Sequence, residues 1–220
     1  MPQFAGPTPL IDLVLKAQQY YSGSDVTAVF VSDPDADFEP GPIRKCDVSR
    51  IYKFENTLYE FRMNGRQLKN LMEISAKYYH TWHAGDPEVT TDLKSLSFTY
   101  LIFRGVDYDI DLAREIGDRI RNLKWPDGRA VYDNDVFTLS INDYWGRMRL
   151  LNPASDFGPD LPELLAKDLR PDIGMVRDMI TEYIVNVKNG LITPECDKNW
   201  RLTAGSIPLE EAVTKPAKPV

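Results

Sequence analysis

Cysteine, histidine and long apolar runs are all scarce in this sequence. Its 220 residues include two cysteines and two histidines, and two cysteines are too few for a disulfide framework. No apolar run approaches the roughly 18 residues that a membrane span requires, so we expect no such span. The net charge is -7. Because binding a nucleic-acid polymer requires a basic face, this charge argues against such a partner, although an acidic protein can hold one small nucleotide in a local pocket.

The two cysteines and the first residues carry little information about compartment. The opening MPQFAGPTPLIDL lacks a charged region followed by a sustained apolar region, so no secretory signal is visible. Cys46 and Cys196 lie far apart in the sequence, and their pairing stays open at this stage. Two unpaired thiols are the simpler expectation.

Metal-binding patterns in the chain are incomplete. His80 and His83 lie in YHTWHAGD, where the spacing suits one zinc ion, but no cysteine or third histidine is near enough to complete a site. The alternating Asp33, Asp35 and Asp37 suggest calcium but lack the glycine and the terminal glutamate of an EF-hand loop. We therefore expect no metal site in this chain, and we expect the histidines to lie in a polar loop.

The apolar residues follow both helical and strand periodicities. Helical spacing predicts helices over residues 9–21 and 66–79, and a last long helix that Asp172 caps and Gly190 ends. Asn64 and Gly65 are expected to form a turn, and residues 32–42 a proline-rich loop. A loop with one short helix near 161–169 is expected over 152–171. Strands are predicted over 26–31, 58–63, 97–103, 106–112 and 136–141.

This order of elements predicts an α+β fold with a mixed sheet and packed helices, because strands and helices do not alternate as steady βαβ units. We expect one domain over residues 1–202. The composition becomes polar and proline-containing after that point, so residues 203–220 are expected to form a disordered tail.

Four segments of the chain carry a family resemblance. They are IYKFENTLYEFRMNGRQLKNLMEISAKYY from residue 51, SFTYLIFRGVDYDID from 97, SINDYW from 140 and TPECDKNW from 193. Together they resemble the C-terminal domain of the 5'-nucleotidase and 2',3'-cyclic-nucleotide phosphodiesterase family. The resemblance implies a parent protein in which this domain grips the nucleoside and an N-terminal metallophosphoesterase domain holds two divalent metal ions. It also implies a secreted, periplasmic or cell-surface parent.

The resemblance further implies that two aromatic side chains sandwich the base. Stacking suits this role because every base presents a π-face. By position, Phe98 and Tyr144 are the candidates, with Tyr100 in reserve because it lies two residues from Phe98 on the same strand face. Aromatic residues in strands are more often core residues. The candidates for hydrogen bonds to the base or ribose are Thr99, Asn142 and Asp143, although Asn and Asp in turns commonly satisfy backbone groups instead.

One segment departs from the family pattern. Where the 5'-nucleotidase branch has Gly-Gly-x-Arg, with an arginine that contacts phosphate, residues 32–37 read SDPDAD. No phosphate-binding arginine can be carried over, and the departure resembles the branch that acts on 2',3'-cyclic nucleotides and 3'-nucleotides. Arg44, Lys45 and Arg50 lie nearby, but a solvated face is the commoner explanation for such residues.

The sequence therefore predicts a nucleotide-recognition domain of a metal-dependent nucleotide phosphohydrolase. It contains no Gly-x-Ser-x-Gly elbow and no glycine-rich phosphate loop, so we expect this chain alone to bind and not to hydrolyse. An alternative is a non-catalytic binding or surface-interaction module that keeps the fold without the nucleoside slot. A further alternative is a domain that meets its catalytic partner in trans.

Overall fold

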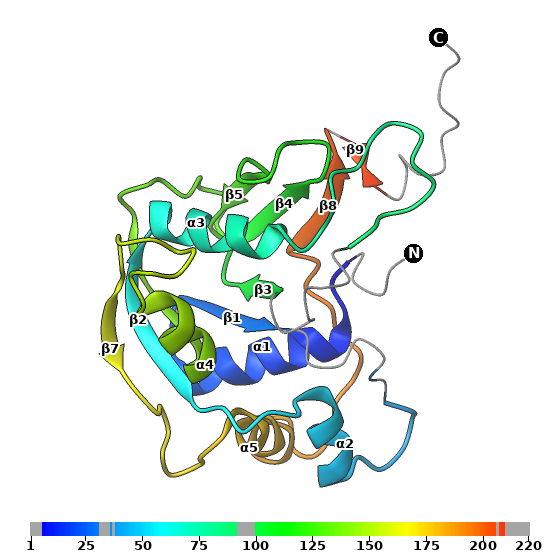
Figure 1. The fold of residues 1–220 in the computed structure, drawn as a ribbon. Helices are drawn as coiled ribbons and strands as arrows, with labels where there is room; N and C mark the ends of the chain where they lie inside the picture. The colour runs from blue at the N-terminus through cyan, green and yellow to red at the C-terminus, as the bar shows by residue number, and fades with distance from the viewer. Residues whose placement is uncertain (1–5, 31–35, 37, 92–99, 206, 210–220) are drawn as a thin grey trace.

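Two β-sheets with packed helices make up the described part of the protein, which in this computed structural model comprises residues 6–30, 36, 38–91, 100–205 and 207–209. The first sheet has five strands in the order β3-β1-β6-β2-β7, and the second has four in the order β5-β4-β8-β9. In Figure 1, α3 lies between the first sheet and the second. The predicted α+β class is confirmed, but the strands divide between two sheets instead of forming one.

The five-stranded sheet is mixed. Its strands are β1 (Val26–Phe30), β2 (Leu58–Asn64), β3 (Leu101–Arg104), β6 (Val136–Asn142) and β7 (Glu163–Ala166). Strands β1 and β6 run parallel, whereas β3 is antiparallel to β1, and β2 is antiparallel to both β6 and β7. Strand β7 lies where the sequence predicted a short helix. Its pairing with β2 explains the difference, because partners distant in the sequence supply the backbone hydrogen bonds.

The second sheet contains β4 (Asp107–Asp111), β5 (Ile120–Lys124), β8 (Trp200–Ala204) and β9 (Ile207–Pro208). Strand β5 was not predicted. Strands β3 and β4 are consecutive, yet they belong to different sheets. Gly105 lies between them at φ +96°, and a Cβ there would collide with the backbone of Asp25. Only glycine fits this crossing point.

The first residues of the expected tail belong to the second sheet. Strand β8 continues through Thr203 and Ala204, and these two residues pair with β9. Leu209 is also buried. Residues 203–205 and 207–209 therefore belong to the fold, because the pairing of β8 with β9 and the burial of Leu209 outweigh their polar composition.

Helix boundaries follow local capping chemistry. Helix α1 (Pro9–Ser22) begins at the N-cap Thr8 and ends at Gly23 in the left-handed region. Asn64 is the N-cap of α3 (Gly65–Ala76), so the predicted turn is a helix cap. Helix α5 (Val176–Glu182), continued by the π-helical η3 (Tyr183–Val187), has Met175 and not Asp172 at its N-cap. Helix α2 (Lys45–Ile51) was not predicted.

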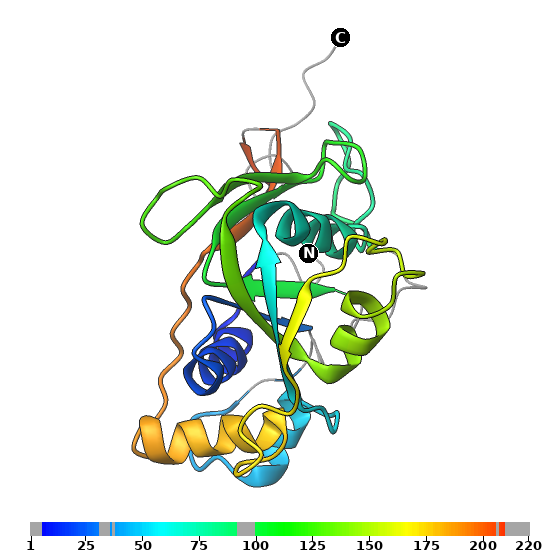
Figure 2. The ribbon, with the colours of Figure 1, turned by 90° about the vertical axis from the view of Figure 1, so that its left-hand side faces the viewer.

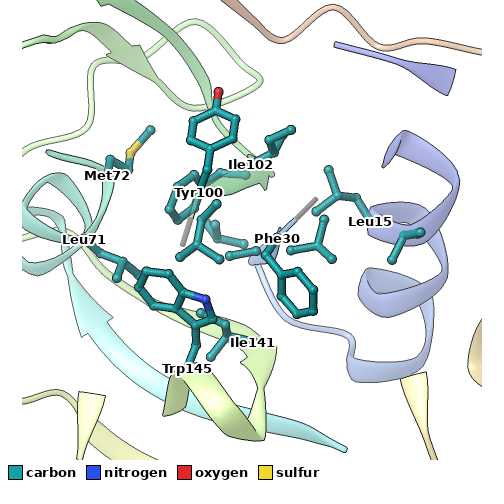
Figure 3. Packing of buried hydrophobic residues seen from close by; sticks show 14 of the residues in the cluster. Leu15, Phe30, Leu71, Met72, Tyr100, Ile102, Ile141 and Trp145 are labelled. Atoms are coloured by element: carbon teal, nitrogen blue, oxygen red, sulfur yellow. The ribbon is translucent and has the colours of Figure 1, made fainter. Parts of the chain in front are cut away.

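One hydrophobic core joins the sheet to its helices. Figure 2 shows α1 on one side of the five-stranded sheet and α4 on the other. Figure 3 shows Leu15 of α1, Phe30 of β1, Ile141 of β6 and Leu71 of α3 converging with Trp145 in the interior. Each fully buried side chain of this kind stabilises the fold by about 1.5 to 3 kcal/mol. This packing fixes the ends of β1 and β6, where the candidate site lies.

Candidate functional site

Strand register brings the two predicted binding segments to one edge of the five-stranded sheet. Strands β1 and β6 are parallel, so their carboxyl ends lie on the same side. Phe30 at the end of β1 pairs with Leu101 at the start of β3, and Leu58 at the start of β2 pairs with Asn142 at the end of β6. We call this side of the sheet the carboxyl edge.

One strand separates the two strands that lead to the predicted binding segments. Strand β1 separates β3 from β6, so the segments before Leu101 and after Asn142 leave strands that are about 10 Å apart. Aromatic side chains projecting from such positions can approach both faces of a ring held between them. Phe98 and Thr99 lie outside the described residues, so their predicted roles remain predictions.

Tyr144 projects from a short helical segment that follows β6. Helix α4 (Asp143–Trp145) continues into the π-helical η2 (Gly146–Leu150). Trp145 is buried, whereas Tyr144 is 42% exposed. A Cβ at Gly146 would crowd the rings of Tyr59 and Phe61, so glycine allows this segment to pack closely on β2. Burial of Trp145 and close packing at Gly146 together present Tyr144 to solvent at the carboxyl edge.

Asn142 and Asp143 hold this segment in place. The Asn142 side chain accepts a hydrogen bond from the backbone N–H of Trp145 at 2.9 Å and so caps α4. Asp143 accepts a hydrogen bond from Asn56 at 2.8 Å and forms an ion pair with Arg147 at 2.7 Å. Asn142 therefore satisfies a backbone group, whereas Asp143 contacts two side chains. Within the described residues, buried Nδ2 of Asn142 has no hydrogen-bond partner.

Tyr100 is a core residue in this structure. Its ring is 1% exposed and stacks on Tyr78 at 5.2 Å, with Tyr79 and Trp200 packed edge-on. Burial raises the pKa of its phenol well above 10. Figure 3 shows the ring within the packed interior. The reserve candidate Tyr100 therefore has a core role, because a base could stack on it only by disrupting this aromatic cluster.

Phe54 is an exposed aromatic residue at the carboxyl edge that sequence reasoning missed. It is 41% exposed and lies 5.3 Å from the ring of Phe30 at the end of β1. It comes two residues before Asn56, which contacts Asp143. An aromatic residue just before a strand in a polar segment, FENT, was the available signal. The pairing of β2 with β6 joins the segment that contains Phe54 to the segment that contains Tyr144.

The polar chain behind Tyr144 starts in the interior. The buried Tyr52 hydroxyl donates to Oδ1 of Asn56 at 3.3 Å, and Nδ2 of Asn56 donates to Asp143. Burial, and to a smaller extent the Asp143 carboxylate, raises the pKa of Tyr52 well above 10. The phenol therefore stays protonated and keeps donating. This chain ties the segment before β2 to the segment after β6.

The described residues offer no ligand set for a two-metal centre. Among residues 6–30, 36, 38–91, 100–205 and 207–209, no group of three or more His, Cys, Asp or Glu side chains is placed to hold a metal ion. His80 contacts Thr90, and His83 lies 3.5 Å from Asp86 at the surface. Asp33, Asp35 and Asp37 lie outside the described residues.

Three further features bear on the earlier expectations. Cys46 and Cys196 are both unpaired thiols. Within the described part of the chain, no helix is long and apolar enough to cross a membrane. A mostly apolar cavity of about 620 Å³ lies between α1 and the segments 36–43 and 188–195, and it reaches Phe30 and Ile51 near the carboxyl edge.

The comparisons with known proteins agree with this arrangement. The family model for the 5'-nucleotidase C-terminal domain matches residues 2–148, which include β1, β2, β3, β6 and Tyr144. The chain belongs to this family. The 5'-nucleotidase C-terminal domain of this chain thus contains every segment of the carboxyl edge.

Similar proteins are much longer than this chain. A 2',3'-cyclic-nucleotide 2'-phosphodiesterase/3'-nucleotidase from Haemophilus influenzae is 26% identical over 69% of the chain and 24% of its own length. The corresponding protein from Yersinia enterocolitica is 23% identical over 74% of the chain and 26% of its own length. A solved structure assigned as a 5'-nucleotidase from Staphylococcus aureus superposes with a TM-score of 0.75 at 22% identity, covering 90% of this chain and 37% of that one. This chain spans about a quarter of the length of these curated relatives.

Proposed function

We propose that this 5'-nucleotidase C-terminal domain recognises the nucleoside part of a nucleotide by stacking the base against Tyr144. Phe98 is the predicted partner on the opposite side, and Phe54 is a second aromatic surface at the same edge. In the parent protein, the domain would present the phosphate to a separate metallophosphoesterase domain. The substrate class would be nucleotides, with 2',3'-cyclic and 3'-nucleotides favoured by the sequence departure at residues 32–37.

The exposure of Tyr144 at the carboxyl edge carries this proposal. Exposing a large aromatic ring to solvent forgoes the free energy that its burial would contribute. The exposure of Tyr144 next to the buried Trp145 therefore supports a role in binding. The polar chain from Tyr52 to Asp143 fixes the backbone on which Tyr144 is mounted. A fixed ring loses little conformational entropy on binding, which favours affinity.

Hydrolysis is assigned to another domain because the described residues lack the chemistry. Phosphoester hydrolysis by two metal ions requires several ligands that hold the ions about 3.5 to 4 Å apart. The described residues do not fit such a centre. This chain would therefore contribute binding and orientation, and the metal ions of the parent would supply the activated water and neutralise phosphoryl charge.

Calorimetric titration of the chain with adenosine and 3'-AMP tests the stacking role. Tyr144→Ala is expected to weaken the binding of both ligands by about tenfold or more, because one stacked base contributes roughly 1 to 3 kcal/mol. Its thermal stability should change little, since the ring is exposed. Tyr132→Ala is the matched control, because that ring is 63% exposed and lies on the segment between β5 and β6. Equal affinity in the Tyr144 and Tyr132 variants would refute the stacking role.

The same titration separates this proposal from the alternative of a non-catalytic module. A module that keeps the fold without a slot would bind neither adenosine nor 3'-AMP, while unfolding as cooperatively as a folded domain. Phe54→Ala tests whether Phe54 is a second stacking surface. If Phe54 stacks on the base, this variant should bind adenosine more weakly than the Tyr132→Ala control does. The coding sequence upstream of residue 1 bears on the parent, since an open frame with metallophosphoesterase motifs supports the enzyme.

A further inference from the structure

The apolar cavity beside α1 contains no residue that the proposed function assigns to the nucleoside. Its volume is about 620 Å³, within the roughly 300 to 1,000 Å³ of small-molecule sites, which are also lined mainly by apolar side chains. Its floor combines buried residues of α1, β1, α2 and η3, which are Leu13, Val14, Val29, Phe30, Ile51 and Tyr183. The fold therefore builds this floor from four separate elements.

The cavity opens to solvent between residues 39–41 and the segment that follows η3. Leu191 lines the cavity and is 73% exposed, and the exposed residues 39–41 line it from the other side. Residues that both line a cavity and face solvent mark its mouth. Figure 2 shows the segment after η3, in orange, on its way to β8. A ligand can therefore reach the apolar floor from solvent through this mouth.

Contacts with α1 and β3 fix the wall that this segment forms. The backbone N–H of Asp197 donates to the buried carboxylate of Asp12 at 2.5 Å. Nδ2 of Asn199 donates to the carbonyl oxygens of Phe103 at 2.9 Å and Val106 at 2.7 Å. Because these bonds hold the wall in place, the cavity is preformed, and a ligand would pay little ordering entropy on entering it.

Two lysines supply positive charge at the cavity. Lys16 and Lys188 both line it and pair with the same carboxylate, Glu195, at 3.4 Å and 3.9 Å. Lys16 also pairs with Asp197 at 3.0 Å. The Lys188 ammonium lies 6.0 Å from the centroid of the Tyr183 ring, which belongs to the floor. Its distance from Glu195 exceeds hydrogen-bond length, so this pair leaves the three N–H donors of Lys188 to an anion.

We propose that the cavity binds an elongated apolar molecule with one carboxylate head, whose apolar body lies on the floor and whose head pairs with Lys188. The apolar lining selects the body, and the weakly paired ammonium selects the charge. Glu39 lies on the opposite wall, so repulsion by its carboxylate favours a head group at Lys188 over one across the mouth. The site would be separate from the nucleoside site, since the two share no residue.

Calorimetric titration of the full chain with decanoate, 1-decanol and acetate tests the proposal, with decanoate kept below its micelle concentration. Decanoate is expected to bind about tenfold more tightly than 1-decanol, and acetate should give no measurable binding because it lacks the apolar body. Lys188→Gln should weaken decanoate binding about tenfold and change 1-decanol binding less than twofold. Lys124→Gln is the matched control, because Lys124 is an exposed lysine on β5 of the second sheet.

Two further variants locate the bound decanoate. Ile43→Trp places a large ring in the cavity, which Ile43 lines, and should abolish the binding of decanoate and 1-decanol. Leu191→Asp places a negative charge at the mouth without changing the core, because Leu191 is exposed, and should weaken decanoate binding more than 1-decanol binding.

Three results would overturn the proposal. The native chain would fail to bind decanoate, or decanoate would bind equally to the Lys188 and Lys124 variants, which removes the anchor. Decanoate affinity that is unchanged in both Ile43→Trp and Leu191→Asp would place the ligand outside the cavity.

Discussion

Replacing Arg119 with methionine should destabilise the protein far more than replacing a surface arginine. Arg119 is 0% exposed. Its guanidinium donates to the carbonyl oxygens of Ala76 at 3.0 Å, Tyr79 at 2.6 Å and Arg114 at 3.2 Å, and to the Thr81 hydroxyl at 2.8 Å. Ala76 is the last residue of α3 and Tyr79 follows it by three residues, so the guanidinium lies at the C-terminal end of the helix, where the helix dipole favours a positive charge. The side chain therefore staples the end of α3 to β5.

The magnitude follows from two opposing contributions. Hydrogen bonds to a charged group contribute about 1.5 to 3 kcal/mol each, although four from one group are not additive. Burial of the guanidinium costs several kcal/mol, and the same burial lowers the pKa of Arg119. Methionine would recover that cost but remove all four of these donors, and within the described part of the chain the Ala76 carbonyl alone would keep a partner, the backbone N–H of Tyr79. We expect a net loss of about 3 kcal/mol, or roughly 6 to 12 °C in Tm for a chain of this size.

Urea unfolding at pH 7, followed by circular dichroism, measures the loss. Arg121→Met is the control, because Arg121 lies two residues away, is partly exposed and pairs with Asp118 at 2.7 Å. Such an exposed pair contributes about 0 to 1 kcal/mol. If the two variants unfold at the same urea concentration with equal slopes, the buried guanidinium does not staple α3, and the reasoning is refuted.

Two further predictions concern acid and packing. The backbone N–H of Tyr132, then the indole of Trp125 and Arg129, lower the pKa of Asp135 from 3.8 to about 2. The stability that this carboxylate contributes is therefore full above pH 3.8 and is lost as the pH falls toward 2. Urea unfolding across this range should show that the difference in unfolding free energy between the native chain and Asp135→Asn becomes smaller. A constant difference would contradict the prediction. Gly65→Ala should destabilise the protein by about 1 to 3 kcal/mol although alanine has the better helix propensity, because the alanine Cβ would collide with the carbonyl of Tyr132. A calorimetric Tm at or above that of the native chain would disprove this.

Local chemistry made part of the fold predictable. Residues 9–21 carry an apolar stripe, a threonine cap and a closing glycine, all of which act within a few residues, and α1 forms there. Strands β1, β2 and β6 also lie where periodicity predicted them. Strands β5 and β7 were missed because their sequences, IRNLK and ELLA, carry weak patterns. Their hydrogen bonds come from distant strands, which a local pattern does not contain.

The candidate site was predictable in part for the same reason. The resemblance pointed to Tyr144, and that residue is 42% exposed in the structure. Strand periodicity added Tyr100 as the reserve candidate, and Tyr100 packs against Tyr78, which follows α3, and against Trp200 of β8. The alternation of side chains along a strand does not indicate which of its two faces a second sheet will cover. Phe54 becomes a candidate only through the hydrogen bond between Asn56 and Asp143, which joins the segment before β2 to the segment after β6.

By itself, the sequence determined the α+β class, most helices and central strands, and membership of a nucleotidase domain family. These features were accessible because helix caps, hydrophobic periodicity and sequence motifs are properties of short segments. Tertiary structure alone decided which strands share a sheet, which aromatic rings are exposed and which side chains contact Asp143. Those features depend on contacts between residues far apart in the chain, and such contacts exist only after the sheets have formed and the core has closed.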